Sequence, residues 1–258
     1  TVSVLYWIAM DCTWPLAFAI PGRKSLAWQS LVQSGEESKG RAAEGATELY
    51  ELRRRISDFF AAKDPGSQPQ RSFVDDVAKP YAQLVKAATL HFDCSHLGTG
   101  KGKAHTTSIE FTDAWTYDER KTSAAIVEVA WVLHNIAASL SIIGSQSVAS
   151  GTADGLKAAF QTFQEAAGYI KLLREAVMPA MPTGEQVGMF LPESIEFCES
   201  LLLANAAHAF TLRAALQEGA KPSLLAKLYR DVGDAYQRLG GASNMHGPKA
   251  RAFLAVQA

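Results

Sequence analysis

The sequence predicts an all-α protein with one small β element near its N-terminus. After Gly45, apolar residues return every three or four positions through most of the chain, as they do on the buried face of a helix. Between residues 123 and 240 this pattern predicts four successive helices joined by polar turns. Short strands are favoured by the apolar stretch that ends at Pro21 and by the alternating stretch at residues 109–115.

Composition and charge are those of a globular protein with a sizeable core. The 258 residues are 48% hydrophobic and 20% charged, and 25 Lys and Arg oppose 26 Asp and Glu for a net charge of −1. This balance argues against strong sequence-independent binding to nucleic acid or to an anionic bilayer. The three cysteines, Cys12, Cys94 and Cys198, are far apart, which favours a reducing compartment such as the cytoplasm.

Residues 1–22 are apolar enough to raise the question of a membrane span. Asp11 and Pro15 interrupt the stretch, and a central Asp costs about 2.5–3.5 kcal/mol on insertion scales, so a span is disfavoured. The positive residues that begin a signal peptide are missing. We expect a short strand here that is ended by Pro21 and Gly22.

Two helices are expected before a glycine-containing surface loop at residues 93–108. The apolar face of the first helix consists of Leu49, Leu52, Ile56 and Phe59. The second helix is expected to start near Pro80, because proline is tolerated in a first turn and not in the middle of a helix. In the first helix Arg53, Arg54 and Arg55 point in three directions, and a solvated face is the favoured interpretation.

The strongest apolar pattern predicts a central helix over residues 123–143. It is apolar on two sides, which is typical of a helix packed between neighbours. The next helix contains "FQTFQEAAGYIKLLRE" at residues 160–175, and Thr152 or Asp154 is its candidate N-cap.

Two further helices complete the pattern. The first covers residues 193–218, with Pro192 in the place of an N1 proline and Gly219 in the place of a C′ glycine. The last runs from Ser223 to a stop at Gly240–Gly241. Helix hairpins stacked into an α-solenoid and a globular bundle both fit this succession.

Two loop sequences contain residue types that are found in ligand sites. The segment "GTGKGK" at residues 98–103 lacks the spacing of a phosphate-binding loop, and a mobile loop is the favoured interpretation. His91, Cys94, His96 and His105 contain enough donors for zinc, which needs about four ligands. Their spacing matches no established ligand pattern, so no metal and no cofactor are predicted.

Catalytic residues are not predicted either. His134 and His208 lie inside apolar helices, where a core histidine is favoured over a general base. Glu128 stands alone in an apolar setting and is expected to form a structural hydrogen bond or ion pair.

Several segments carry a family resemblance. "FTDAW", "VEVAWVLHNIAASLSIIG", "ADGLKAAFQTFQEAAGYIKLLRE", "LLLANAAHAFTLRA" and "SLLAKLYRDVGDAYQR" occur in this order between residues 109 and 240. Together they resemble the Bro-one domain of Alix and its relatives in endosomal sorting. "LYELRRRISDFF" and "LAFAIPGRKS" are similar to an early helix and the opening strand of that family.

Two positions depart from the family pattern. "FTDAW" lacks the Trp that the family usually has between Phe111 and Asp113, and His134 replaces the usual Phe of the core helix. The resemblance implies a single domain over residues 16–258, with residues 1–15 as an extension, and the family's final helices would begin about where this chain ends.

The resemblance implies a boomerang-shaped helical scaffold with tetratricopeptide-like hairpins. It implies a non-enzymatic, cytoplasmic adaptor that is recruited to endosomes and contacts their membrane only indirectly. Its partner would be the C-terminal amphipathic helix of an ESCRT-III subunit, held in an exposed groove for sorting or membrane scission. By position, the peptide-binding residues would be Ala125, Val129, Glu196 and Ser200, although Glu196 and Ser200 replace the apolar residues and Lys that the family prefers.

Three alternatives stay open from the sequence. Val129 is also explained by core packing. The chain could be a generic helical-repeat interaction module with a different partner, which the altered residues Glu196 and Ser200 would favour. A metal-dependent enzyme built on His91, Cys94 and His96 is the least favoured alternative.

Overall fold

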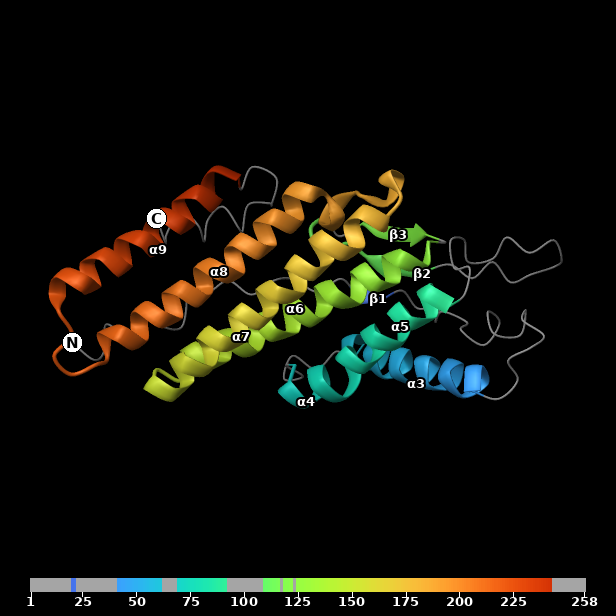
Figure 1. Ribbon diagram of the computed structural model, residues 1–258, viewed down its shortest axis with the longest axis horizontal. Coiled ribbons are helices and arrows are strands. Elements are labelled where there is room, and N and C mark those ends of the chain that lie inside the picture. The colour runs from blue at the N-terminus through green and yellow to red at the C-terminus, as the bar shows by residue number, and fades with distance from the viewer. Residues whose placement is uncertain are drawn as a thin grey trace. The chain divides into compact units, whose positions relative to one another are not determined.

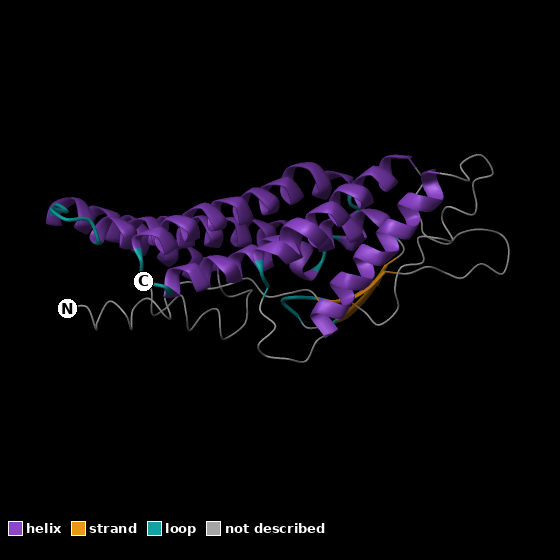
Figure 2. Ribbon diagram, turned by 90° about the horizontal axis from the view of Figure 1, so that it is seen from below, coloured by secondary structure: helices purple, strands orange, loops and turns teal. Residues whose placement is uncertain are grey.

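The computed structural model describes residues 20–21, 41–61, 69–91, 109–116, 118–122 and 124–242. Helices make up most of these residues, and the strands form one small sheet (Figure 2), as predicted. In chain order the elements are β1 (Ile20–Pro21), α3 (Arg41–Ala61), α4 (Arg71–Phe73), α5 (Lys79–His91), β2 (Ile109–Thr112), β3 (Glu119–Thr122), α6 (Ala125–Ala149), α7 (Ala153–Leu172), α8 (Pro192–Ala215) and α9 (Pro222–Ala242) (Figure 1).

The described residues form two compact units. The sheet unit comprises the described parts of residues 18–136 and 175–190. The hairpin unit comprises the described parts of residues 137–174 and 191–258, and it contains α7, α8 and α9.

The sheet has the order β1-β2-β3, with both pairs antiparallel. β1 and β2 confirm the two predicted strands. β3 was not predicted, because its residues "ERKT" are polar and show no apolar alternation. Pairing with β2 defines it instead, and the cross-strand neighbours Glu110 and Lys121 form an ion pair of 3.3 Å.

Asp113, in the turn after β2, is buried and connects two segments of the sheet unit through hydrogen bonds. Its Oδ1 accepts hydrogen bonds from the backbone N–H groups of Trp115 (2.8 Å) and Thr116 (3.0 Å), and its Oδ2 accepts one from Met189 N (3.0 Å). Gly188 has a φ of +58°, and a Cβ there would collide with the Asp113 carboxylate. The Asp of "FTDAW" therefore ties the turn to the 3₁₀ turn Gly188–Phe190.

The first helices confirm the predicted apolar face. Leu49, Leu52 and Ile56 of α3 are buried, and Phe59 stacks on Phe73 with ring centroids 4.0 Å apart. Arg53 corrects the prediction of a solvated face, because its side chain is only 1% exposed.

α5 begins at Lys79, next to Pro80, as predicted, but helical structure also precedes it, which was not predicted. α4, a π-helical turn at Val74–Ala78 and α5 follow one another without a break, so Pro80 lies inside a helical run. Lys79 N–H donates to Val74 O, five residues back. We attribute the tolerance of Pro80 to this turn, because wider spacing moves the carbonyl that a proline ring would otherwise meet.

The central helix α6 begins close to the predicted residue and runs six residues longer, to Ala149. Every residue from 127 to 141 is buried, as its two apolar sides predict. Of the helices in the described part of the chain, α6 is the one long and apolar enough to cross a membrane by length and composition. Because 83% of its most apolar stretch is buried in the protein, this is only weak evidence for a span.

Local signals set the ends of the hairpin-unit helices. Thr152 is the N-cap of α7, since its Oγ1 accepts a hydrogen bond from Gly155 N at 3.0 Å. α8 begins at Pro192 as predicted but ends at Ala215, and Gly219 (φ +75°) lies in the turn that follows. The predicted stop at Gly240–Gly241 is wrong, because α9 continues through both glycines to Ala242.

Candidate protein-docking surface

Helix α8 presents one exposed stripe along most of its length. Glu196, Ser200, Leu203, Ala207 and Phe210 recur at intervals of three or four residues, which places them on one face of the helix. All five are exposed, Leu203 by 48% and Phe210 by 45%. The other residues of this part of α8 are buried, except the half-buried Glu199. We call these five residues the α8 stripe.

The second half of the α8 stripe is apolar. Leu203, Ala207 and Phe210 follow one another over two helical turns, so their exposed side chains form a continuous row. Single exposed apolar residues are ordinary, whereas contiguous ones mark surfaces that bind other molecules. This row is the feature of the described residues that points most directly to a binding function.

Two contacts define how α7 lies beside α8. The rings of Phe160 and Phe210 meet with centroids 5.9 Å apart. Beyond the other end of α7, the Arg174 guanidinium forms an ion pair of 3.3 Å with Glu199. The two helices are therefore antiparallel, and the α7 residues between these contacts lie alongside Leu203 and Ala207.

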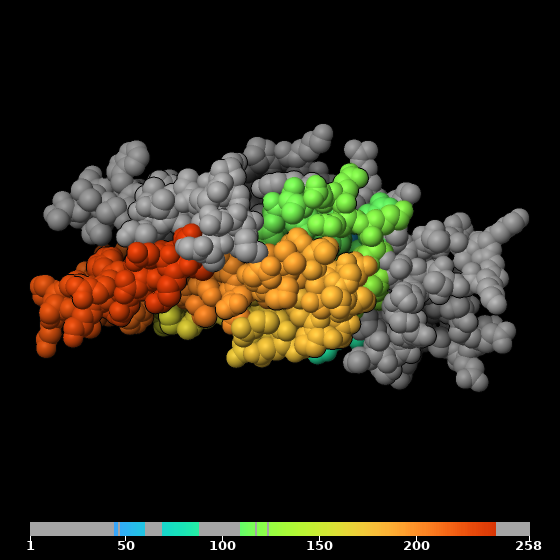
Figure 3. Space-filling view, turned by 90° about the horizontal axis from the view of Figure 1, so that it is seen from above, coloured from blue at the N-terminus to red at the C-terminus, as the bar shows by residue number. Residues whose placement is uncertain are grey.

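On its other side α8 packs against α9 through a buried polar cluster. The Tyr236 hydroxyl donates a hydrogen bond to Asn205 Oδ1 (2.8 Å), and the Tyr236 ring meets the His208 ring edge-on with centroids 5.9 Å apart. All three residues are buried. α8 thus lies between α7 and α9 (Figure 1), and part of it is visible in the space-filling view, in orange (Figure 3).

The four residues predicted to bind a peptide fall into two pairs. Glu196 and Ser200 are exposed, lie one turn apart and begin the α8 stripe in the hairpin unit. Ala125 and Val129 lie one turn apart on α6 in the sheet unit and are buried, with 1% and 3% exposure. A direct role in peptide binding stays a prediction for all four residues.

The apolar half of the α8 stripe was missed at the sequence level. Leu201, Leu202 and Leu203 are consecutive, and only the last is exposed. The spacing Glu196, Ser200, Leu203, Ala207 could have indicated the shared face, because the first two had already been singled out.

Glu128 forms the structural ion pair that its apolar surroundings predict. Its Oε1 accepts a hydrogen bond from the Tyr81 hydroxyl (2.7 Å) and lies 2.6 Å from Arg53 Nε. The Arg53 guanidinium also lies over the Trp131 ring, 4.4 Å from the centroid. The Glu128 carboxylate raises the pKa of Arg53 against the opposing effect of burial, so the arginine stays charged inside the sheet unit.

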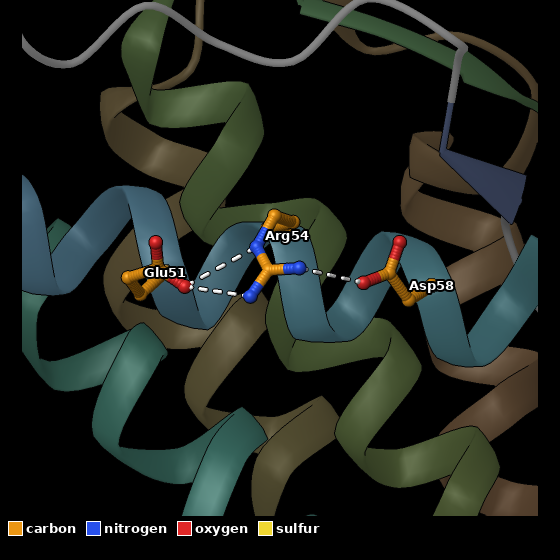
Figure 4. A network of polar contacts seen from close by, with 3 residues as sticks. All are labelled: Glu51, Arg54 and Asp58. Atoms are coloured by element: carbon orange, nitrogen blue, oxygen red, sulfur yellow. Dashed lines mark hydrogen bonds and ion pairs between the residues drawn. The ribbon is translucent and has the colours of Figure 1, made fainter.

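The next arginine has a different environment. Arg54 is exposed and lies between Glu51 and Asp58 on the surface of α3, where its nitrogens are 2.9 Å and 3.5 Å from the nearest carboxylate oxygens (Figure 4). Exposed pairs of this kind contribute little to stability.

The two histidines considered as general bases lie in the protein core. His134 and His208 are buried, as expected of core histidines. Burial also raises the pKa of the Cys198 thiol, which keeps it protonated and unreactive.

No group of three or more potential metal ligands occurs in the part of the chain that the structure describes. Of the zinc candidates, Cys94, His96 and His105 lie outside the described residues, as does the His91 side chain. The segment at residues 98–103 lies outside them too.

The chain is similar to a known protein family and to a curated protein. The family model of the BRO1-like domain matches residues 27–252. The pH-response regulator protein RIM20 of Yarrowia lipolytica is 32% identical over 176 residues, which cover 66% of this chain and 21% of that protein. The chain therefore spans about a fifth of this curated relative.

Solved structures show the same fold at low sequence identity. The BRO1 domain of ALIX in complex with CHMP4C is 19% identical, with a TM-score of 0.73 over 95% of this chain and 69% of that one. A Bro1 domain whose structure was solved as a basis for endosomal targeting is 16% identical, with a TM-score of 0.67 over 95% of this chain and 66% of that one.

Proposed function

Because this chain belongs to the BRO1-like domain family, we propose that it is a non-enzymatic adaptor whose α8 stripe binds the C-terminal amphipathic helix of an ESCRT-III subunit. The family comprises adaptors associated with the ESCRT machinery. The ALIX domain bound to CHMP4C supports the kind of partner, and the Bro1 domain associated with endosomal targeting supports the place of action.

The observation that carries the proposal is the spacing of the exposed apolar side chains. Leu203, Ala207 and Phe210 repeat with the period of a helix surface, and a partner helix with anchors at i, i+3 or i+4, and i+7 has the same repeat. Apolar area removed from water on docking would supply about 25 cal/mol per Å² before the cost of association is subtracted.

The cellular setting follows from the same reasoning. The adaptor would work in the cytoplasm and reach endosomes through its partner, so its contact with the membrane would be indirect. The net charge of −1 favours this arrangement over direct binding to anionic lipid or nucleic acid.

One rival function has an observation in its favour. Glu196 and Ser200 give the α8 stripe a polar start, which would also suit a helical-repeat interaction module with an unrelated partner. The two functions differ in their ligand and share the surface.

The test is a fluorescence anisotropy titration of the full chain with C-terminal helix peptides of the same organism's ESCRT-III subunits. Leu203→Asp should weaken binding at least about tenfold, or about 1.4 kcal/mol, because it places a charge under an apolar anchor. Val129 is unsuitable for this test, because an Asp at a buried position would unfold the protein.

Leu224→Asp is the matched control. Leu224 is 52% exposed on α9, outside the α8 stripe, so this variant should bind like the wild type. Equal loss of binding in both variants, or no saturable binding by any tail peptide to folded wild type, would contradict the proposal. In the second case the rival module would become the favoured function.

A further inference from the structure

The α8 stripe changes its chemistry from one end to the other. Its first residue, Glu196, is exposed, and Glu193 is exposed one turn earlier. Ser200 follows, and from Leu203 onward the stripe is apolar. A ligand helix lying along α8 would therefore meet a carboxylate at one end, the Ser200 hydroxyl next to it, and apolar side chains from Leu203 onward.

Glu196 has no ion-pair partner among the described residues. The neighbouring Glu199 is paired with Arg174 at 3.3 Å, which occupies that guanidinium. Lys171, on the last turn of α7, is exposed and forms no described ion pair with Glu196. The Glu196 carboxylate is thus available to a ligand.

The helix dipole of α8 stabilises the carboxylate of Glu193 more than that of Glu196. Carboxylates in the first turn of a helix are stabilised by the N-terminal end of the dipole, and the effect falls off beyond that turn. Glu193 is the second residue of α8, in the first turn, whereas Glu196 is the fifth. Glu196 therefore gains little stabilisation from the helix dipole, and among the described residues it has no ion-pair partner either.

We propose that Glu196 selects ligand helices that carry a Lys or Arg about two turns from the anchor that meets Leu203. Seven residues separate Glu196 from Leu203, or about 10.5 Å along the helix axis. A helix lying parallel or antiparallel to α8 has the same rise, so its basic residue would lie seven positions from that anchor. This inference rests on the proposed function and adds a charge requirement to its ligand.

The requirement follows from the negative charge of the exposed Glu196 carboxylate. A carboxylate on the ligand would face Glu196 with like charge, and the repulsion would reduce affinity. A basic side chain would form an ion pair at the rim, where such pairs determine specificity more than total affinity. We therefore expect a moderate effect on affinity and a clear preference between charges.

The test uses the full chain and variants of the tail peptide that binds most tightly in the titration above. In one series of peptides, Lys, Gln or Glu is placed seven positions before the apolar residue that meets Leu203. In a second series the same residues are placed seven positions after it. Both series are needed because the peptide can lie along α8 in either direction. Wild type should prefer Lys over Glu at least about fivefold in one series, and Glu196→Lys should reverse the preference. The preference for Lys over Glu should be smaller at about 500 mM salt than at about 50 mM, because salt screens the interaction between charges.

Asp234→Lys is the matched control, because Asp234 is exposed on α9 and the substitution makes the same change of charge. It should leave the wild-type preference intact. Equal binding of all peptides in both series, with Leu203→Asp still weakening binding, would overturn this inference and leave the proposed function standing. No binding by any peptide to folded protein would overturn both.

Discussion

Arg53 and Glu128 show what a single buried contact does in this protein. Both side chains are almost fully shielded from water, and Tyr81 and Trp131 complete their surroundings. Removing two charges from water is costly, so such a pair adds little net stability compared with apolar residues. Once the pair is buried, however, each charge depends on the other.

Glu128→Gln should therefore be strongly destabilising. The substitution keeps the shape of the side chain and leaves the Arg53 charge buried without its counterion, which costs about 3–5 kcal/mol. Urea unfolding followed by circular dichroism would measure the loss.

The exposed network in Figure 4 offers the control for this variant. Arg54→Met removes a guanidinium one residue away on the same helix, and the unfolding midpoint should barely change because water screens that site. If both variants lost stability equally, burial would not be the source of the effect.

At the scale of elements, helix ends are set by short-range chemistry and helix interiors by packing. The Thr152 hydroxyl satisfies Gly155 N–H at the start of α7, where no intrahelical partner exists. By contrast, the run from α4 to α5 passes through Pro80 because a π-helical turn precedes it. The first feature can be read from a few residues, and the second depends on how the whole run packs.

Thr152→Ala should destabilise the protein by about 1 kcal/mol, because it removes the N-cap acceptor of α7. Thr152→Ser keeps an acceptor and should retain most of the stability. Thermal unfolding of both variants would measure the difference, and equal losses would show that the hydroxyl is not what stabilises this end.

At the scale of the whole molecule, α6 is the element common to both compact units. Residues up to Ile136 belong to the sheet unit and residues from Ala137 to the hairpin unit, within one unbroken helix. A continuous helix that supplies core residues to both units should couple their unfolding.

We expect one cooperative unfolding transition for the full chain. Gly144→Ala would bring a Cβ to about 2.8 Å from the buried Phe163 ring in the hairpin unit. It should lower the same midpoint that Glu128→Gln lowers in the sheet unit. Circular dichroism and tryptophan fluorescence should give coincident curves, and two resolved transitions would contradict this expectation.

The sequence by itself determined the helical class, the approximate bounds of most helices and the family. Helical periodicity and N-cap residues depend on a few neighbouring positions. They therefore predict α3, α6, α7, α8 and α9 without knowledge of the fold. The ordered segments from "FTDAW" to "SLLAKLYRDVGDAYQR" carried the family resemblance that the BRO1-like match then confirmed.

Tertiary structure alone decided which side chains meet water. α8 is apolar on several sides, so its pattern does not distinguish the exposed Leu203 from the buried Leu202. Arg53 looks like its exposed neighbour Arg54 until Glu128 is placed beside it by the fold. β3 exists because β2 supplies its hydrogen-bond partners. Glu128 is far from Arg53 in sequence, and the partners of β3 lie on a neighbouring strand, so the pattern within each segment does not indicate these contacts.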